Sequence, residues 1–153
     1  MSLKLKYSNE VESAKKKLKP VLALESTIIA HGMPFPQNLN FALEAESTCR
    51  SKGVTPATVA IIDGTVCVGL EREEMDLISR SKNIKKVSTR ELGLAVSFGW
   101  DGATTVSSTM QVGRKIVRGE AVMVLSIDDP IPNKLLDTII EVDGITNANP
   151  VTL

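Results

Sequence analysis

The sequence has little of several residue types on which particular functions depend. Among its 153 residues there are two cysteines, one histidine and only 3% aromatic residues. Cys49 and Cys67 lack the Cys-x-x-Cys spacing and the histidine cluster of zinc sites, so the pattern predicts neither a zinc site nor a disulfide framework. This cysteine usage favours a reduced, cytoplasmic protein.

The chain also lacks an excess of charge of either sign and a long apolar run. Eighteen basic residues balance eighteen acidic ones, and the locally basic residues 15–19 are typical of a solvated helix face. No apolar run approaches the roughly 20 residues that a membrane-spanning helix requires. We therefore expect neither nucleic acid nor a membrane as a partner.

The apolar content that is present indicates an α/β protein. With 42% hydrophobic residues, the chain can form one core, and its length predicts a single domain over residues 1–153. Segments typical of strands alternate with segments typical of helices. Asp63-Gly64, between the apolar segments Thr58–Ile62 and Thr65–Gly69, is a strong hairpin signal, so the sheet should contain an antiparallel pair.

The first third of the chain carries signals for a helix, a strand and a second helix. Residues 8–19 predict a short surface helix, and residues 21–29 predict a buried strand. Asn38 is placed to cap a helix that runs to about Lys52, with Phe41 on its packed face. This pattern indicates a helix packed on a sheet.

Two later segments are informative in different ways. Residues 71–80 predict a helix with Met75, Leu77 and Ile78 directed inward. Gly102–Thr109 is small, uncharged and rich in hydroxyl groups. Two interpretations fit it: a strand or turn whose polar groups face a ligand, and a tightly packed core of small residues.

The most informative segment is residues 23–38, where polar residues follow a short apolar run. It reads Ala-Leu-Glu-Ser-Thr-Ile-Ile-Ala-His-Gly-Met-Pro-Phe-Pro-Gln-Asn and contains the only histidine, His31. Glu25 should emerge at the end of the strand, where partial desolvation would favour its proton-donating form. The alternatives are that Glu25 caps the local loop and that His31 holds backbone carbonyls.

This segment and three others resemble, in order and spacing, the pseudouridine-5'-phosphate glycosidases, also called the indigoidine synthase A family. The other three are Pro56–Gly64, Lys86–Leu92 and Gly102–Met110. The resemblance covers about residues 20–112 and leaves residues 113–153 divergent. It implies an α/β/α sandwich with a mixed sheet, shortened relative to the family, and it implies homotrimeric assembly.

The resemblance also implies roles for individual residues. Glu25 matches the general acid that protonates the uracil carbon, and Lys86 matches the lysine that contacts the substrate phosphate. Val106 matches a residue in contact with the substrate, and Thr105 and His31 belong to the same matched stretches. A solvated basic face is the alternative for Lys86, and sheet packing is the alternative for Thr105 and Val106.

The reaction implied by the resemblance is the reversible conversion of pseudouridine 5'-phosphate and water into uracil and ribose 5-phosphate. The family also uses Mn²⁺, bound through an aspartate, and a lysine that forms a Schiff base with ring-opened ribose 5-phosphate. No segment of this sequence matches either motif, so we transfer neither a metal ligand nor a nucleophile. Asp128 and Asp129 fit a turn before Pro130 better than a metal site.

Three functional hypotheses stay open at this point. The first is an active glycosidase of the family type. The second is a shortened, catalytically inactive homologue that binds a nucleotide phosphate or another subunit, since cleavage of a C–C glycosidic bond requires an electron sink as well as an acid. The third is a generic small α/β binding domain.

Overall fold

The computed structural model describes residues 5–113 and residue 132. The chain divides into two units, residues 1–123 and 124–153, and every described helix and strand lies in the first. In chain order the elements are β1 Leu5–Tyr7, α1 Asn9–Lys16, β2 Val21–Leu24, η1 Ile28–Gly32, α2 Gln37–Ser51, β3 Thr55–Ile62, β4 Thr65–Val68, α3 Arg72–Arg80, β5 Lys85–Val87, α4 Leu92–Ser97, β6 Gly102–Thr104 and α5 Val106–Gly113.

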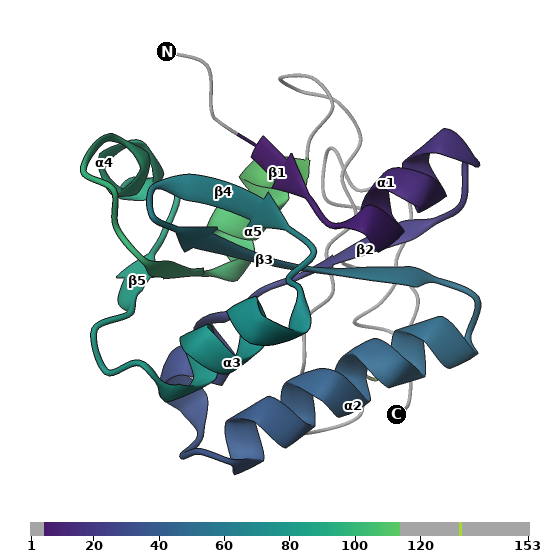
Figure 1. Ribbon diagram of the computed structural model, residues 1–153, viewed down its shortest axis with the longest axis horizontal. Coiled ribbons are helices and arrows are strands. Elements are labelled where there is room, and N and C mark those ends of the chain that lie inside the picture. The colour runs from purple at the N-terminus through teal and green to yellow at the C-terminus, as the bar shows by residue number, and fades with distance from the viewer. Residues whose placement is uncertain (1–4, 114–131, 133–153) are drawn as a thin grey trace. The chain divides into compact units, whose positions relative to one another are not determined.

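The described strands form a six-stranded mixed sheet with helices on both faces (Figure 1). Side chains alternate between the two faces along β3. Ala60 faces a core shared with η1, α2 and α3, whereas Val59 and Ile61 face a core shared with α1 and α4. All three side chains are fully buried. This arrangement confirms the expected α/β/α sandwich with a mixed sheet.

The central strand β3 is paired along both of its edges. On one edge lies β4, antiparallel to β3, with β1 parallel to β4 beyond it. On the other edge β2 runs parallel to the first half of β3, and β6 runs antiparallel to the second half, with β5 parallel to β6 beyond it. Because β2 and β6 approach the same edge from opposite ends, their carboxyl ends meet beside Val59.

The predicted hairpin is confirmed between β3 and β4. Asp63 and Gly64 have φ values of 47° and 66°, as a two-residue turn with the twist of the flanking strands requires. A Cβ at Gly64 would lie 2.8 Å from the carbonyl oxygen of Val96, so the turn also packs closely against α4. The turn geometry and the packing against α4 therefore both favour glycine at position 64.

The expected strand over residues 21–29 is wrong in its second half. Strand β2 ends at Leu24, and Ile28–Gly32 forms the π-helical turn η1. The next position along the edge of β3 is occupied by β6, so β2 cannot continue, and the chain leaves the sheet at Glu25 and Ser26. The apolar Ile28 and Ile29 pack onto the sheet from η1 instead.

The predicted helices are confirmed in place, with corrections to their packed faces. Pro36, not Asn38, occupies the N-cap of α2, and the Asn38 amide is buried, donating to the carbonyls of Ile29 and Ser79. Phe41 and Leu77, which we expected to face inward, are 40% and 41% exposed. In α2 the inward positions belong to a neighbouring helical stripe that includes the polar Asn38 and Glu46, which hydropathy alone assigns to the surface.

None of the helices in the described ranges has the length and apolar character to cross a membrane.

Candidate active site

The residues predicted to form a site follow strands whose carboxyl ends converge. The Ser26 N–H donates to the Thr104 carbonyl at 3.1 Å, which joins the end of β2 to the end of β6. The Thr105 N–H donates to the Val87 carbonyl at 3.0 Å, which joins β6 to the end of β5. Sites in open α/β sheets lie at the carboxyl ends of strands where neighbouring connections diverge. The segments that carry Glu25, Lys86 and Thr105 are thus brought together.

Glu25 is partly buried at the point where β2 leaves the sheet. One carboxylate oxygen accepts a hydrogen bond from the Thr27 N–H at 2.9 Å, and the other accepts from the Ile28 N–H at 3.1 Å. These N–H groups begin the η1 turn and have no earlier carbonyl to bond, so the capping contact of the alternative interpretation is present. The same two bonds hold the carboxylate in one orientation, which a positioned proton donor also needs.

A buried set of hydroxyl groups closes the junction between β2 and β6. The carbonyl of Val59 accepts hydrogen bonds from Ser26 Oγ at 2.7 Å and from Thr104 Oγ1 at 2.5 Å. Thr109 Oγ1 donates to Thr104 Oγ1 at 2.9 Å. For Thr104 and Thr109 the packed-core interpretation therefore holds, because their hydroxyl groups are bonded within the protein. The hydroxyl groups take the place of backbone partners where neither strand continues.

Thr105 and Val106 follow this junction and are less enclosed. Both are partly exposed, and Val106 is the first residue of α5. Thr105 Oγ1 lies 3.0 Å from Ser107 Oγ, a contact between two side chains at the surface. These residues are therefore accessible at the strand ends, whereas the preceding Thr104 is fully buried.

Lys86 is exposed on β5, the strand at one side of the sheet. It lies opposite Ala103, on the sheet face that packs against η1, whereas Lys85 lies opposite Gly102 on the other face. The ammonium of Lys85 is placed 4.8 Å from the ring centre of Trp100. Strand alternation thus places Lys86 on the η1 side of the sheet and Lys85, beside Trp100, on the other side.

His31 lies near the end of η1 and is exposed. Within the described residues no hydrogen bond joins it to Glu25 or Lys86. The turn itself is a feature that the sequence analysis missed, since π-helical turns carry no simple sequence signal. Such turns are frequent at functional sites.

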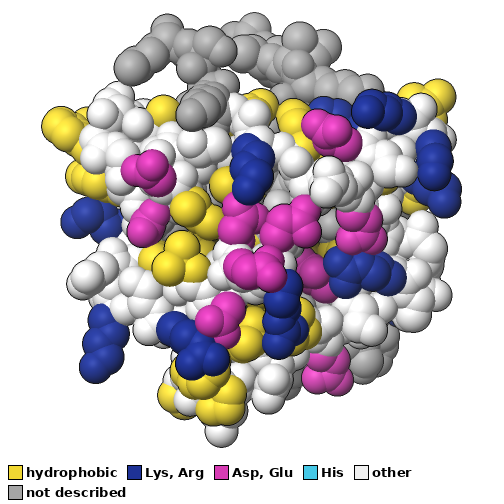
Figure 2. All heavy atoms as spheres, viewed as in Figure 1, with side chains coloured by type: hydrophobic (Ala, Val, Ile, Leu, Met, Phe, Trp, Pro, Cys, Tyr) yellow, Lys and Arg dark blue, Asp and Glu magenta, His cyan; other side chains and the backbone are white. Residues whose placement is uncertain are grey.

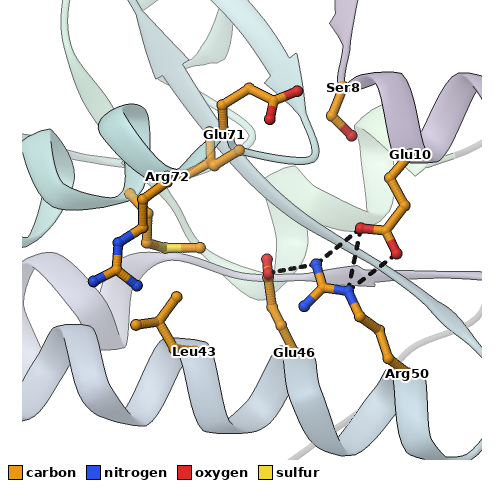
Figure 3. A pocket seen from close by; sticks show the side chains of 9 residues that line it. Ser8, Glu10, Leu43, Glu46, Arg50, Glu71 and Arg72 are labelled. Atoms are coloured by element: carbon orange, nitrogen blue, oxygen red, sulfur yellow. Dashed lines mark hydrogen bonds and ion pairs between the residues drawn. The ribbon is translucent and has the colours of Figure 1, made fainter.

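A cavity of about 200 Å³ lies elsewhere, between α1, α2 and the start of α3 (Figure 3). It shares no residue with the predicted site. Figure 2 shows acidic side chains gathered on this face, with Lys and Arg side chains between them. The lining consists of Ser8, Glu10, Leu43, Glu46, Arg50, Leu70, Glu71, Arg72 and Met75.

The polar wall of this cavity is an ion-pair network built around Glu46, whose burial the sequence analysis also missed. Glu46 is 5% exposed and accepts hydrogen bonds from Thr58 Oγ1 at 2.7 Å and from Arg50 Nη2 at 3.0 Å. Arg50 also donates to Glu10 of α1 at 2.8 Å. The hydrogen bond to Glu10, and after it the one to Glu46, raise the pKa of Arg50. The i, i+4 spacing of Glu46 and Arg50 is the feature of the sequence from which this ion pair could have been predicted.

The described residues do not fit the Mn²⁺ site that the resemblance implies. Among them no group of three or more His, Cys, Asp and Glu side chains is arranged to hold a metal ion. Asp128 and Asp129 lie outside the described residues. We derive no chemical step through a metal.

The comparisons with known proteins agree on one family. The family model described as "Indigoidine synthase A like protein" matches residues 10–118. A pseudouridine-5'-phosphate glycosidase of Escherichia coli K12 is 56% identical over 107 residues, which cover 69% of this chain and 34% of that protein. One from Staphylococcus aureus MW2 is 48% identical over 106 residues, with the same two shares.

Two crystal structures show the same fold. An indigoidine synthase A-like protein of Thermotoga maritima has a TM-score of 0.64 and 31% identity, over 74% of this chain and 36% of that chain. The prealnumycin C-glycosynthase AlnA, in complex with ribulose 5-phosphate, has a TM-score of 0.64, 33% identity and the same two shares. The chain spans about a third of the length of these relatives. From the family match and these identities, we conclude that the chain belongs to the family of indigoidine synthase A-like proteins.

Proposed function

We propose that this chain supplies the acid and the phosphate-binding group of a site for a phosphorylated ribosyl pyrimidine. The reaction is that of its relatives named pseudouridine-5'-phosphate glycosidase. One observation carries the proposal: the ends of β2, β5 and β6 converge, so that the segments bearing Glu25, Lys86 and Thr105 adjoin. The 56% identity to the Escherichia coli enzyme supports the choice of substrate class.

Glu25 is the proposed general acid. In the cleavage direction its carboxyl group gives a proton to the uracil carbon that is bonded to the ribose, so that this carbon leaves with the electron pair of the broken C–C bond. The resulting carboxylate keeps the Thr27 and Ile28 N–H groups as partners. Cleavage also requires an electron-accepting group on the sugar side, which we assign to no residue of this chain.

Lys86 is the proposed phosphate-binding group. It is exposed, lies on the η1 face of the sheet, and makes no ion pair within the part of the chain that the structure describes. An ammonium group with no competing carboxylate binds a phosphate monoester as a point charge. Thr105, Val106 and His31 are proposed to line the same site. The neighbour AlnA is in complex with a phosphosugar, ribulose 5-phosphate, which supports this ligand class.

Ribose 5-phosphate binding tests the proposal, because it needs no turnover. We expect saturable binding in an NMR titration, with shifts at the amides of the β5 and β6 ends. Lys86→Met should weaken binding about tenfold or more, as loss of a charged hydrogen bond predicts. Lys85→Met is the matched control, since Lys85 lies on the other face over Trp100, and it should bind as the wild type does.

Two further arms make the outcome decisive. Ribose without phosphate should bind much more weakly, and equal binding of the two sugars would contradict a phosphate site at Lys86. Condensation of uracil with ribose 5-phosphate in the presence of Mn²⁺, with borohydride trapping of a lysine adduct, then tests turnover. Binding without turnover would favour the inactive homologue over the enzyme.

We also propose that copies of this chain assemble into a homo-oligomer, which sedimentation tests.

A further inference from the structure

Thr27 joins the proposed acid to the β6 end of the site. Its backbone N–H donates to Glu25 Oε2 at 2.9 Å, and its hydroxyl donates to the carbonyl of Thr104 at 3.1 Å. Thr104 is the last residue of β6 and is followed directly by Thr105 and Val106. One residue therefore bonds to Glu25 through its backbone and to the opposing strand through its side chain.

The atom that anchors the Thr27 hydroxyl is itself held firmly. Thr104 is fully buried, and its carbonyl also accepts from the Ser26 N–H at 3.1 Å. The Thr104 N–H donates to Ser26 Oγ at 2.9 Å, and Thr104 Oγ1 donates to the Val59 carbonyl. Each polar group of Thr104 thus has a protein partner, so its carbonyl is a fixed reference point for Thr27.

Glu25 has no such anchor of its own. The hydrogen bonds given for its carboxylate come from the Thr27 and Ile28 N–H groups at the start of η1, and its side chain is only partly buried. The direction of the carboxylate therefore depends on where η1 begins. Ser26 ties the residue before the turn to β6, and the Thr27 hydroxyl adds a bond from the first residue of the turn to the same Thr104 carbonyl.

We propose that Thr27 is a positioning residue: its hydroxyl bond to Thr104 keeps the Glu25 carboxylate aligned with the Thr105–Val106 segment. The inference rests on the proposed function and adds a residue that determines the geometry of its acid. Without the hydroxyl group, the start of η1 can shift, and the two N–H groups hold the carboxylate less well. A small misplacement of a catalytic group is enough to lower a rate strongly.

Thr27→Val removes the hydroxyl group at nearly constant volume, and Thr27→Ser retains it. The valine variant should fold, because the Thr104 carbonyl keeps its hydrogen bond from the Ser26 N–H and is not left unpaired. Thr48→Val on α2 is the matched control for the same chemical change away from the site.

The first readout is the pH-dependent NMR shift of the amides at positions 27 and 28, which report the hydrogen bonds to Glu25. Glu25→Gln identifies the part of this shift that comes from the carboxyl group. We expect Thr27→Val to lose at least about half of that part, and Thr27→Ser and Thr48→Val to keep it. Full retention in the valine variant, or no rescue by serine, would overturn the inference.

The second readout is turnover of uracil and ribose 5-phosphate. Thr27→Val should lower kcat about tenfold or more with little change in KM, because phosphate binding does not depend on Thr27, and serine should restore kcat. A higher KM with unchanged kcat would contradict a positioning role. If the wild type shows no turnover, that result counts against the proposed enzyme, while the amide readout still decides the role of Thr27.

Discussion

Two glutamates, Glu25 and Glu46, show how differently this protein holds a carboxylate. Glu46 lies between α2 and β3, with its side chain 7% exposed and paired with Arg50. Glu25 lies at the end of β2 and accepts its hydrogen bonds from backbone N–H groups. A buried carboxylate with a cation beside it is enclosed by the protein and serves structure. A partly exposed carboxylate held by the backbone stays accessible, and Glu25 is therefore the carboxylate that we propose as the acid.

Removal of the cation beside Glu46 should have the largest effect on stability. Arg50→Met leaves a buried carboxylate without its ion pair, and we expect the free energy of unfolding to fall by about 3 kcal/mol. Urea unfolding followed by circular dichroism measures the change.

The matched control for this prediction is another arginine paired at i, i+4. Arg80 binds Asp76 at 2.7 Å, but both side chains are well exposed, so Arg80→Met should cost only about 0.5 kcal/mol. Equal losses in the two variants would show that burial of Glu46 does not set the difference. Adding Glu46→Gln to Arg50→Met should recover part of the loss.

Substitution of Glu25 should have the opposite profile: a large effect on activity and a small one on stability. Glu25→Gln keeps a hydrogen-bond acceptor for one N–H group, so we expect a loss of at most about 1 kcal/mol in unfolding free energy. Because the amide cannot donate a proton as an acid does, turnover of pseudouridine 5'-phosphate should fall about 100-fold.

Glu44→Gln serves as the control for the Glu25 variant, since Glu44 is exposed on α2. It should change neither turnover nor unfolding. If Glu25→Gln unfolded as readily as Arg50→Met while its turnover stayed at the wild-type level, Glu25 would have a purely structural role, as Glu46 has, and the contrast between the two carboxylates would be lost.

The smallest effect should come from a thiol on the α3 side of the sheet. Burial, followed by the charge of Glu74, raises the pKa of Cys67 from 9.0 to about 11. Between those pH values the unfolded chain releases the thiol proton and the folded chain keeps it. Stability is therefore present in full below pH 9 and falls as the pH rises towards 11. Because solvent screens part of the effect, we expect a loss of roughly 1 kcal/mol, less than half of what an unscreened shift of this size would give.

Urea unfolding at several pH values from 8 to 11 tests this prediction. Cys67→Ala should remove the part of the alkaline decline that comes from the thiol. An identical slope in the alanine variant would mean that other groups, such as the lysines, account for the decline. Cys49, whose pKa burial also raises, is present in both proteins, so the difference between their slopes comes from Cys67.

Local signals in the sequence predicted the elements that depend on nearby residues. The Asp63-Gly64 turn needs two residues that tolerate positive φ, and α3 begins with the acidic pair Glu71 and Glu74 in a capping box. These features depend on backbone preferences within a few residues. They were therefore readable without knowledge of the fold.

The end of β2 and the burial of Glu46 were not readable in this way. Strand β2 stops because β6 occupies the next position on the edge of β3, although these residues lie far apart in the sequence. Glu46 is buried because Thr58 and Arg50 supply partners for both of its oxygens. Hydropathy treats a glutamate as a surface residue, since it does not include such partners.

By itself, the sequence determined the family, the α/β alternation and the hairpin, because motif order and turn chemistry are local properties of the chain. Only the tertiary structure decided that β2 and β6 meet end to end, that their hydroxyl groups close the junction at Val59, and that Thr27 connects Glu25 to Thr104. The physical reason is that a backbone group left unpaired at a strand end must find a partner, and the partner comes from whatever the fold places beside it.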